Sequence, residues 1–294
     1  MTAAALRLRN EDPEVEILFL GASEDLPAPG AGWSSRSVGS FDGSLASAGA
    51  ISLDAIRRGA TLALAGEVSA IVTGPVHKPA LHAAGSFVPG QTEFLGELTR
   101  ASPVGMLMAA ESTRTGRPLR ILLATTHVAL RDVPSLITED RLKVQIRLLD
   151  EGLRVGWGIP SPKITLCALN PHASDGGLFG DEEARVMGPV ADRLRDAGMA
   201  IVGPLPADTA FLTMVEGDAD GIVVPYHDIG MAVFKTLSFG QGVNVTLGLP
   251  FPRTSPDHGT AFDLAGTGRA DPGSAFEALR LAARLARNRD RLVL

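Results

Sequence analysis

The chain has 294 residues, the length of one large domain or two average ones. Its 33 acidic residues outnumber its 27 basic ones, and the net charge of −6 argues against a general binder of nucleic acids or anionic membranes. The single cysteine, Cys167, excludes an intrachain disulfide framework and a cysteine-rich metal site. The apolar runs fall short of the roughly 20 residues that cross a bilayer, and the opening residues lack the apolar core of a signal peptide. We therefore expect a soluble, cytoplasmic protein.

Short apolar runs, bounded by glycine and proline, recur along the chain. Most are nearly continuous in hydrophobic residues, which is typical of strands covered by helices on both faces. Predicted strands lie at 15–20, 68–72, 104–108, 119–123, 163–169, 199–202, 221–224 and 243–247. Helical periodicity predicts helices at 47–65, 138–155, 181–197 and 274–290. The alternation of the two patterns predicts an α/β fold, with the Gly- and Ser-rich stretch 27–47 as an exposed excursion.

Three of the six histidines come directly after predicted strands: His127, His172 and His227. Ligands in open α/β sheets bind beyond the carboxyl ends of the strands, so these imidazoles are placed to converge. Three neutral histidines with one open position make a catalytic site for a divalent metal ion. Taken singly, each is more often a hydrogen-bonded loop residue, and the sequence keeps that alternative open. Asp228 and Asp175 are candidates for orienting the imidazoles, although a solvated loop aspartate is commoner.

Polar and basic residues gather around the same predicted strand ends. The loops 73–78 and 90–93 each open a predicted helix, and a helix N-terminus beside a lysine suits phosphate, although turn chemistry is the commoner explanation. Lys235, Asn244 and Arg253 surround the last predicted strand, where a cation at a core edge is costly. The planar fork of Arg253 suits a phosphate or a carboxylate. These residues predict an anionic substrate.

No G-x-G-x-x-G follows a predicted strand and no P-loop motif occurs, so neither common nucleotide fingerprint is present. The segment 257–268 carries a polar pattern, Asp-His-Gly-Thr-Ala-Phe-Asp, that turn chemistry does not explain.

Seven blocks, in this order, carry a resemblance to a known family: TGPVHK (73–78), GQTEF (90–94), ATTHVALRD (124–132), LNPHASDGG (169–177), GPLPADTAF (203–211), YHDIGMAVFK (226–235) and GVNVTLGLPFPRTSPDHGTAFDLAG (242–266). They closely resemble the 4-hydroxythreonine-4-phosphate dehydrogenase family of pyridoxal phosphate biosynthesis. The resemblance implies two α/β/α lobes of the isocitrate/isopropylmalate dehydrogenase-like type with the active-site cleft between them. It also implies a homodimer with shared active sites. We expect a cofactor-side lobe at 1–92 plus 236–294, and a metal-ligand and dimerisation lobe at 93–235.

The resemblance also assigns roles to residues. His127, His172 and His227 match the family's three metal ligands, which are supplied across the dimer. Substrate-binding positions match Gln91, Thr92, Lys235, Asn244 and Arg253. The family usually has histidine where this chain has Gln91, whose amide still donates a hydrogen bond but carries no charge. His258, Gly259, Thr260 and Asp263 are the candidates for contacts with NAD, which the resemblance implies is bound without a Rossmann fingerprint.

The implied reaction oxidises 4-phosphooxy-threonine at its 3-hydroxyl and then decarboxylates the keto acid to 3-amino-2-oxopropyl phosphate. NAD or NADP takes the hydride, and one divalent ion (Zn, Mg, Co or Mn) lowers the pKa of the hydroxyl. The proposed catalytic residues are Lys235, for proton transfer or phosphate binding, and the carboxylates Asp208 and Asp228. Helix capping explains Asp208 equally well. Two alternatives stay open: a paralogous dehydrogenase acting on 4-phospho-threonate or 4-phospho-erythronate, and a non-catalytic protein that binds a metal or a phosphosugar.

The family normally begins with a strand and a Gly-Asp-Pro-Ala-Gly-Ile-Gly-Pro-Glu loop, whereas this chain opens with residues that resemble the end of the following helix. Because that loop lies beside the nicotinamide in the superfamily, we expect the chain as written to fold but to bind NAD poorly. A start codon assigned too far downstream, or closure of the cleft by the stretch 27–47, are the competing explanations.

Overall fold

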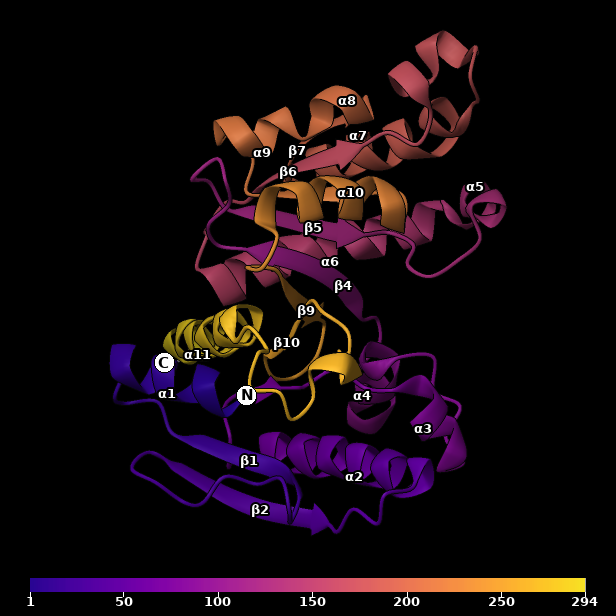
Figure 1. Ribbon diagram of the computed structural model, residues 1–294. Helices are drawn as coiled ribbons and strands as arrows, with labels where there is room; N and C mark the ends of the chain where they lie inside the picture. Colours follow the sequence, from indigo (N-terminus) through magenta and orange to yellow (C-terminus); the bar gives the residue numbers. More distant parts are fainter. Residues whose placement is uncertain (294) are drawn as a thin grey trace. The chain divides into compact units, whose positions relative to one another are not determined.

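The computed structural model describes residues 1–293 and divides into two compact units (Figure 1). Unit 1 comprises Met1–Val104 and Leu249–Arg287, and unit 2 comprises Gly105–Gly248 together with Asn288 and the residues after it. The chain therefore leaves unit 1 after Val104 and re-enters it at Leu249. These crossings lie later in the chain than the lobe boundaries expected from the sequence, at 92/93 and 235/236, so 93–104 belongs to unit 1 and 236–248 to unit 2.

Unit 1 contains two pairs of parallel strands and the helices that pack on them. Strand β1 (Ile17–Ala22) pairs with β2 (Trp33–Gly39), and β3 (Ile71–Val72) pairs with β10 (Arg253–Pro256). Its helices are α1 (Thr2–Glu11), α2 (Leu45–Leu64), α3 (Lys78–Ala83), α4 (Gln91–Thr99) and most of α11 (Gly273–Val293), with the short η4 (Phe262–Leu264) before α11.

The expectation of an exposed excursion at 27–47 is wrong in its middle, where β2 forms. The strand was hidden in the sequence because serine, arginine and glycine make up most of it, and most of its residues are exposed or only partly buried. The strand forms because its backbone groups hydrogen-bond to β1, and an apolar sequence pattern is not needed for that pairing. The helix that follows begins after Ser44, whose side chain accepts a hydrogen bond from the Ser47 N–H.

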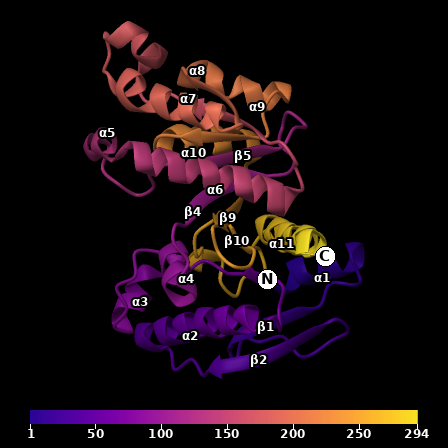
Figure 2. The same ribbon diagram turned by 180° about the vertical axis from the view of Figure 1, so that it is seen from behind.

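Unit 2 is built on six strands in the order β9–β4–β5–β8–β6–β7. Neighbouring pairs among β5, β8, β6 and β7 are parallel, whereas β4 runs antiparallel to both β5 and β9. Helices α6 and α10 cover opposite faces of the central strands (Figures 1 and 2). The strands are β4 (Gly105–Ala110), β5 (Leu119–Leu123), β6 (Lys163–Cys167), β7 (Ala200–Leu205), β8 (Gly221–Val224) and β9 (Val243–Leu247). The helical segments are η1 (Leu130–Asp132), α5 (Val133–Leu136), α6 (Glu139–Trp157), η2 (Pro171–Gly177), η3 (Glu183–Met187), α7 (Gly188–Asp196), α8 (Ala207–Ala210), α9 (Leu212–Glu216) and α10 (His227–Ser238).

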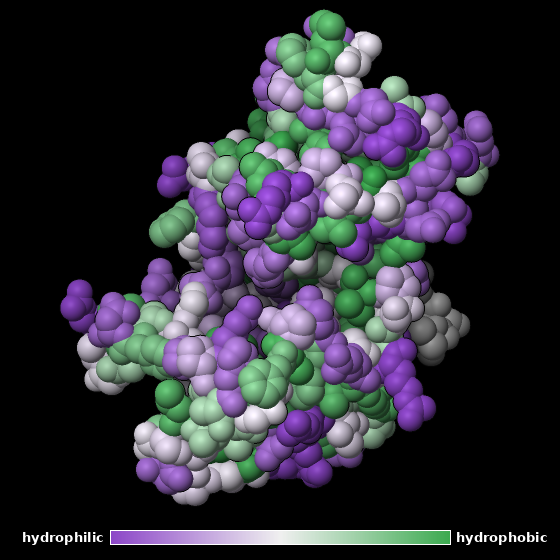
Figure 3. All heavy atoms as spheres, turned by 90° about the vertical axis from the view of Figure 1, so that its right-hand side faces the viewer, coloured by the Kyte–Doolittle hydropathy of each residue, from purple (hydrophilic) through white to green (hydrophobic). Residues whose placement is uncertain are grey.

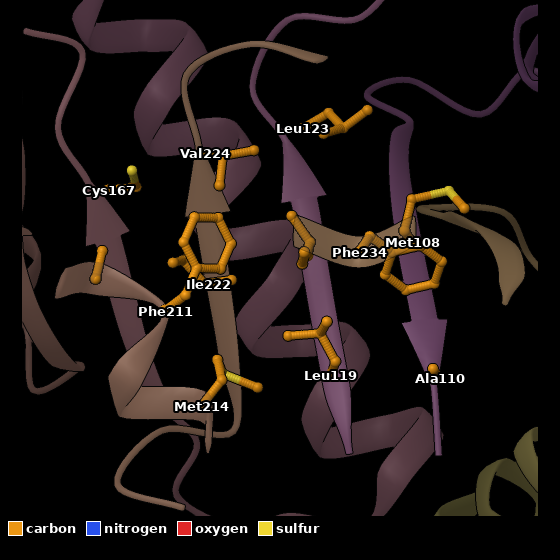
Figure 4. Close-up of a cluster of buried hydrophobic side chains, with 12 residues drawn as sticks. Met108, Ala110, Leu119, Leu123, Cys167, Phe211, Met214, Ile222, Val224 and Phe234 are labelled. Carbon is orange, nitrogen blue, oxygen red and sulfur yellow. The ribbon is translucent and has the colours of Figure 1, made fainter. Parts of the chain in front are cut away.

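One cluster of buried side chains holds α10 against this sheet (Figure 4). Phe234 of α10 is fully buried against residues of β4, β5 and β8, and Phe211 covers the neighbouring strands. All residues of β5 and β8 are buried, which explains why the sequence of β8 is an unbroken apolar run and that of β5 is apolar except at Arg120, which pairs with Glu111. The residues after β8, including His227 at the start of α10, are thereby attached to this buried cluster.

Unit 1 has its own cores. In one, α2, α3 and α4 pack around Ile71 and Phe251, and in the other α1 packs against α11 and β1 through Leu8 and Phe276. Hydrophilic and hydrophobic residues are interspersed on the face of the molecule in Figure 3. Within the described residues, no helix is both long enough and apolar enough to cross a membrane.

Candidate active site

Two of the predicted metal ligands lie next to each other. His127 follows β5 and His227 opens α10 after β8, and the centroids of their rings are 5.4 Å apart. His227 Nδ1 and Asp228 Oδ1 are 2.7 Å apart, so Asp228 orients this imidazole with its other nitrogen available to a ligand. His127 is exposed and His227 is partly buried.

The third predicted ligand, His172, does not join that pair within one chain. It lies in η2, after β6, with its ring 6.5 Å from that of Phe179, and it is exposed. Among the residues described, no three His, Cys, Asp or Glu side chains are grouped closely enough to hold a metal ion. Of the three imidazoles expected to converge, two, those of His127 and His227, therefore lie together within a single chain.

The segment that carries His172 has an unusual backbone. From His172 to Gly176 every φ angle is positive, with values of 52°, 52°, 75°, 43° and 68°. Four of these five residues are not glycine, and left-handed residues other than glycine normally occur singly because their Cβ crowds the backbone. Such a turn persists only where surrounding contacts hold it.

Glu183 supplies those contacts, and the sequence did not single it out. Its carboxylate is buried and accepts hydrogen bonds from the N–H groups of Leu169 and Asn170, both at 2.8 Å, from Asn170 Nδ2 at 2.9 Å and from the Ser174 hydroxyl. These hydrogen bonds outweigh the burial and hold the pKa of Glu183 below its usual value. In the sequence, Glu183 stands in an Asp-Glu-Glu run that reads as the solvated start of a helix, so no local signal marked it.

A second group of polar residues lies in unit 1, around Arg253. The side chain is 2% exposed, and its Nη2 donates to Thr73 Oγ1 at 2.6 Å and to Gln91 Oε1 at 3.1 Å. Gln91 in turn donates from Nε2 to the Gly74 carbonyl at 3.0 Å. Burial lowers the pKa of Arg253 to about 10, although the negative charge of Glu93 acts to raise it. The guanidinium therefore stays protonated at neutral pH. One buried cation, Arg253 of β10, thus joins the loop 73–78 to the first residue of α4.

The other predicted substrate-binding residues are partly buried. Thr92 lies in the first turn of α4 in unit 1, and Lys235 and Asn244 lie on α10 and β9 in unit 2. Asn244 Oδ1 is buried and has no hydrogen-bond partner within the described part of the chain. An acceptor in that state is suited to a ligand that carries a donor.

The predicted carboxylates differ in their surroundings. Asp228 contacts His227, as described above, with its own side chain 89% exposed. Asp208 is exposed in the first turn of α8, where Pro206 and not Asp208 takes the N-cap position. Helix capping therefore does not explain Asp208.

The residues expected to contact NAD lie in the loop between β10 and α11. His258, Gly259 and Asp263 are exposed and Thr260 is partly buried, and His258 Nδ1 donates to the Gly259 carbonyl at 2.8 Å. Phe262 packs edge-on against His77, with 4.9 Å between the ring centroids. The loop is open to solvent along most of its length.

Comparison with known proteins identifies relatives along most of the chain. The sequence profile of the family described as "Pyridoxal phosphate biosynthetic protein PdxA" matches residues 32–282. A 4-hydroxythreonine-4-phosphate dehydrogenase from Aromatoleum aromaticum is 51% identical over 225 residues, which cover 76% of this chain and 67% of that protein. The enzyme of the same name from Chromobacterium violaceum is 49% identical over 223 residues, covering 76% of this chain and 66% of that protein. The chain thus aligns with about two thirds of the length of each relative.

Solved structures agree with these sequence matches. A 4-hydroxythreonine-4-phosphate dehydrogenase from Klebsiella pneumoniae superposes with a TM-score of 0.77 at 37% identity, covering 97% of this chain and 88% of that one. A beta-decarboxylating dehydrogenase from Thermococcus kodakarensis superposes with a TM-score of 0.51 at 14% identity, over 95% of this chain and 88% of that one, and shows a likeness of fold alone. The predicted α/β fold of the isocitrate/isopropylmalate dehydrogenase-like type is confirmed.

Proposed function

The chain belongs to the family of pyridoxal phosphate biosynthetic protein PdxA, as its motifs predicted, and we propose that it oxidises 4-phosphooxy-threonine with NAD and decarboxylates the product to 3-amino-2-oxopropyl phosphate. Relatives named 4-hydroxythreonine-4-phosphate dehydrogenase make it an enzyme of the dehydrogenase class, and that class implies a nicotinamide cofactor and a small phosphorylated substrate. The choice of NAD, the metal and the homodimer belong to the proposal.

The single observation that carries the proposal is the pair of imidazoles, His127 and His227, with Asp228 behind the second. Neutral imidazoles oriented by a carboxylate are typical ligands of a divalent metal ion. The donor set therefore fits a metal, and His172 would complete it from the partner subunit of a homodimer. When bound, a divalent ion such as Zn²⁺, Mg²⁺, Co²⁺ or Mn²⁺ lowers the pKa of a coordinated hydroxyl and stabilises negative charge on a carbonyl oxygen.

Arg253 and its neighbours supply the anion binding. A buried, protonated guanidinium whose Nη2 is fixed by two neutral acceptors is pre-organised for a phosphate or carboxylate. Gln91, which holds Arg253 on one side and the Gly74 carbonyl on the other, sets the position of that cation rather than adding charge. Thr92 and Asn244 would supply further polar contacts.

The reaction places two demands on the protein's own groups. The 3-hydroxyl proton must be taken up as the hydride on C3 passes to the nicotinamide, and a proton must be returned to C2 after carbon dioxide leaves. Lys235 lies on α10, eight residues after His227, and is the proposed group for one of these proton transfers or for binding the phosphate. Asp208 is the second candidate for proton transfer. His258, Gly259, Thr260 and Asp263 are the proposed contacts for NAD.

The decisive experiment follows the formation of NADH or NADPH by the purified protein, using 4-phosphooxy-threonine, 4-phospho-threonate and 4-phospho-erythronate side by side, each with NAD and with NADP. The proposal expects the highest kcat/KM for 4-phosphooxy-threonine with NAD and loss of turnover on chelation. The neutral Gln91 at a substrate position favours keeping the two amine-free acids as second candidates. A higher kcat/KM with either of them would assign the paralogous activity, and no turnover with any would leave a binding protein.

A further inference from the structure

The left-handed turn at His172–Gly176 needs something to hold it, and the contacts of Glu183 are arranged to do so. On one side of His172, the carboxylate accepts hydrogen bonds from the backbone N–H and the side-chain amide of Asn170. On the other side, it accepts a hydrogen bond from the hydroxyl of Ser174. His172 thus lies midway between two points that are tied to one buried group. Its imidazole remains exposed, so the turn itself is held while the ring is left available to a ligand.

We propose that Glu183 is the positioning residue for His172: it holds the strained turn in the conformation in which His172 acts as a metal ligand. This inference rests on the proposed function, because it takes His172 to be a ligand. The argument depends on the acceptor capacity of a carboxylate. Oε1 accepts from two backbone N–H groups, and Oε2 accepts from the Asn170 amide and the Ser174 hydroxyl. The three N–H donors need an acceptor, whereas the serine hydroxyl can rotate to donate or to accept.

A glutamine at this position has the same shape but one acceptor oxygen. If its oxygen faces the Leu169 and Asn170 N–H groups, its NH₂ faces Asn170 Nδ2, which is itself a donor and also donates to Glu182 at 2.7 Å. The Glu183→Gln variant therefore keeps the packing and the two backbone N–H bonds, but it sets a donor against Asn170 Nδ2 and leaves Ser174 tied by a single neutral hydrogen bond, in which the hydroxyl accepts from the new NH₂. With the connection across His172 weakened, part of the ordering of His172 would fall to the moment the metal binds, and the affinity falls accordingly.

The test measures metal affinity directly. Wild-type protein and Glu183→Gln are stripped of metal by chelation and titrated with Co²⁺, whose visible absorption reports the ligands around it. We expect the dissociation constant to rise about 10- to 100-fold, the range typical for outer partners of metal ligands. Turnover should then recover towards the wild-type kcat when Co²⁺ is added in large excess, a rescue that a general loss of folding would not allow.

Asp181→Asn provides the matched control. It removes the same charge from the same segment, but Asp181 is exposed and its side chain pairs with Arg185 rather than with the turn. We expect it to bind Co²⁺ like the wild type. Equal Co²⁺ affinity in Glu183→Gln and the wild type would overturn the inference, as would an equal loss in Asp181→Asn.

Two further variants keep the inference testable if Glu183→Gln does not fold. Ser174→Ala removes one of the four hydrogen bonds and should weaken Co²⁺ binding by a smaller factor, about 3- to 10-fold. Ala173→Gly relieves the strain at a φ of 52° and should restore part of the affinity lost in Ser174→Ala. Unchanged affinity in Ser174→Ala would contradict the inference. Failure of the wild type itself to bind Co²⁺ would instead contradict the proposed function on which it rests.

Discussion

The rings of His127 and His227 lie 5.4 Å apart although one hundred residues separate them in the sequence. They are neighbours because β5 and β8, the strands that precede them, are adjacent and parallel, with Leu123 opposite Val224 at their carboxyl ends. Parallel neighbours deliver the residues that follow them to the same edge of a sheet. The packing of Phe234 against these strands then fixes the helix that His227 opens.

Replacing His172 or His227 by alanine should abolish turnover and leave the melting temperature within a few degrees of the wild type, since neither ring is part of a core. Steady-state NADH formation and thermal unfolding check the two halves of this prediction. His82→Ala is the matched control, because His82 is exposed on α3 and packs only against Phe87 in its ring contacts. Undiminished activity in the His172 or His227 variant, or after exhaustive chelation, would falsify the metal-dependent mechanism.

Arg253→Lys should raise KM for the substrate at least tenfold. A lysine ammonium is a point charge and cannot bind Thr73 and Gln91 while offering a planar fork to an anion. Kinetics at saturating NAD measure the effect, and Arg280→Lys, on the exposed surface of the same unit, is the control. Wild-type KM in Arg253→Lys would place this arginine outside the substrate site.

Gln91→His should be tolerated. An imidazole with one protonated nitrogen offers one donor and one acceptor, the same pair of functions that Gln91 uses towards the Gly74 carbonyl and Arg253. We expect kcat/KM within about threefold of the wild type. Gln91→Leu, which removes both hydrogen bonds at similar size, is the informative comparison and should lower kcat/KM by more than tenfold. Similar losses in both variants would contradict the bridging role.

The thiol of Cys167 should be inert in the folded protein. Burial, with the nearby charge of Glu183 adding to it, raises the pKa of Cys167 to about 12, so the thiolate is scarce at neutral and mildly alkaline pH. A thiol reagent should label the native protein far more slowly than the same protein in guanidinium chloride, where one thiol per chain becomes reactive. Rapid labelling of the native protein would show that the end of β6 opens readily.

The ion pair between Asp12 and Arg287 should make a small, pH-dependent contribution to stability. Arg287 holds Asp12 through two hydrogen bonds, at 2.5 and 2.9 Å, which lowers the pKa of Asp12 below its usual value of 3.8. A carboxyl with a lowered folded-state pKa stabilises the protein above its unfolded-state pKa, and the effect is lost as pH falls through the folded-state value. Because the arginine is 46% exposed, we expect Asp12→Asn to lower the free energy of unfolding by only about 0.5 kcal/mol near neutral pH.

Urea unfolding of the wild type and Asp12→Asn at several pH values measures this difference. It should be constant from neutral pH down to the usual pKa of an aspartate and then shrink towards zero in stronger acid. A difference that grew as the pH fell would have the wrong sign for this ion pair. The adjacent carboxylate Glu11, which pairs more loosely with Arg7 at 3.6 Å, provides the control variant Glu11→Gln.

The strands of unit 2 were predictable because their own residues decide them. Strands β5, β8 and β9 coincide with the mainly apolar runs at 119–123, 221–224 and 243–247, since most residues of a strand buried on both faces are apolar. Arg120, Asn244 and Thr246 are the polar exceptions. Strand β10 was missed for the opposite reason: Arg253–Pro256 is polar in sequence but buried, and it forms because β3 pairs with it and Thr254 donates to the Ala278 carbonyl at 2.8 Å.

The sequence by itself determined the α/β class, the family and the chemical character of the site, because buried strands and long motifs are written in consecutive residues. Only the tertiary structure decided which of those residues meet. Gln91 and Arg253 are 162 positions apart and share a hydrogen bond, while the three strand-end histidines are equivalent in sequence and yet only two are neighbours within one chain. The role of Glu183 is likewise decided by tertiary structure, since it exists only where the buried carboxylate meets Ser174, nine residues earlier in the chain. Strand order and long-range hydrogen bonding determine which residues become neighbours, and no local sequence pattern encodes either of them.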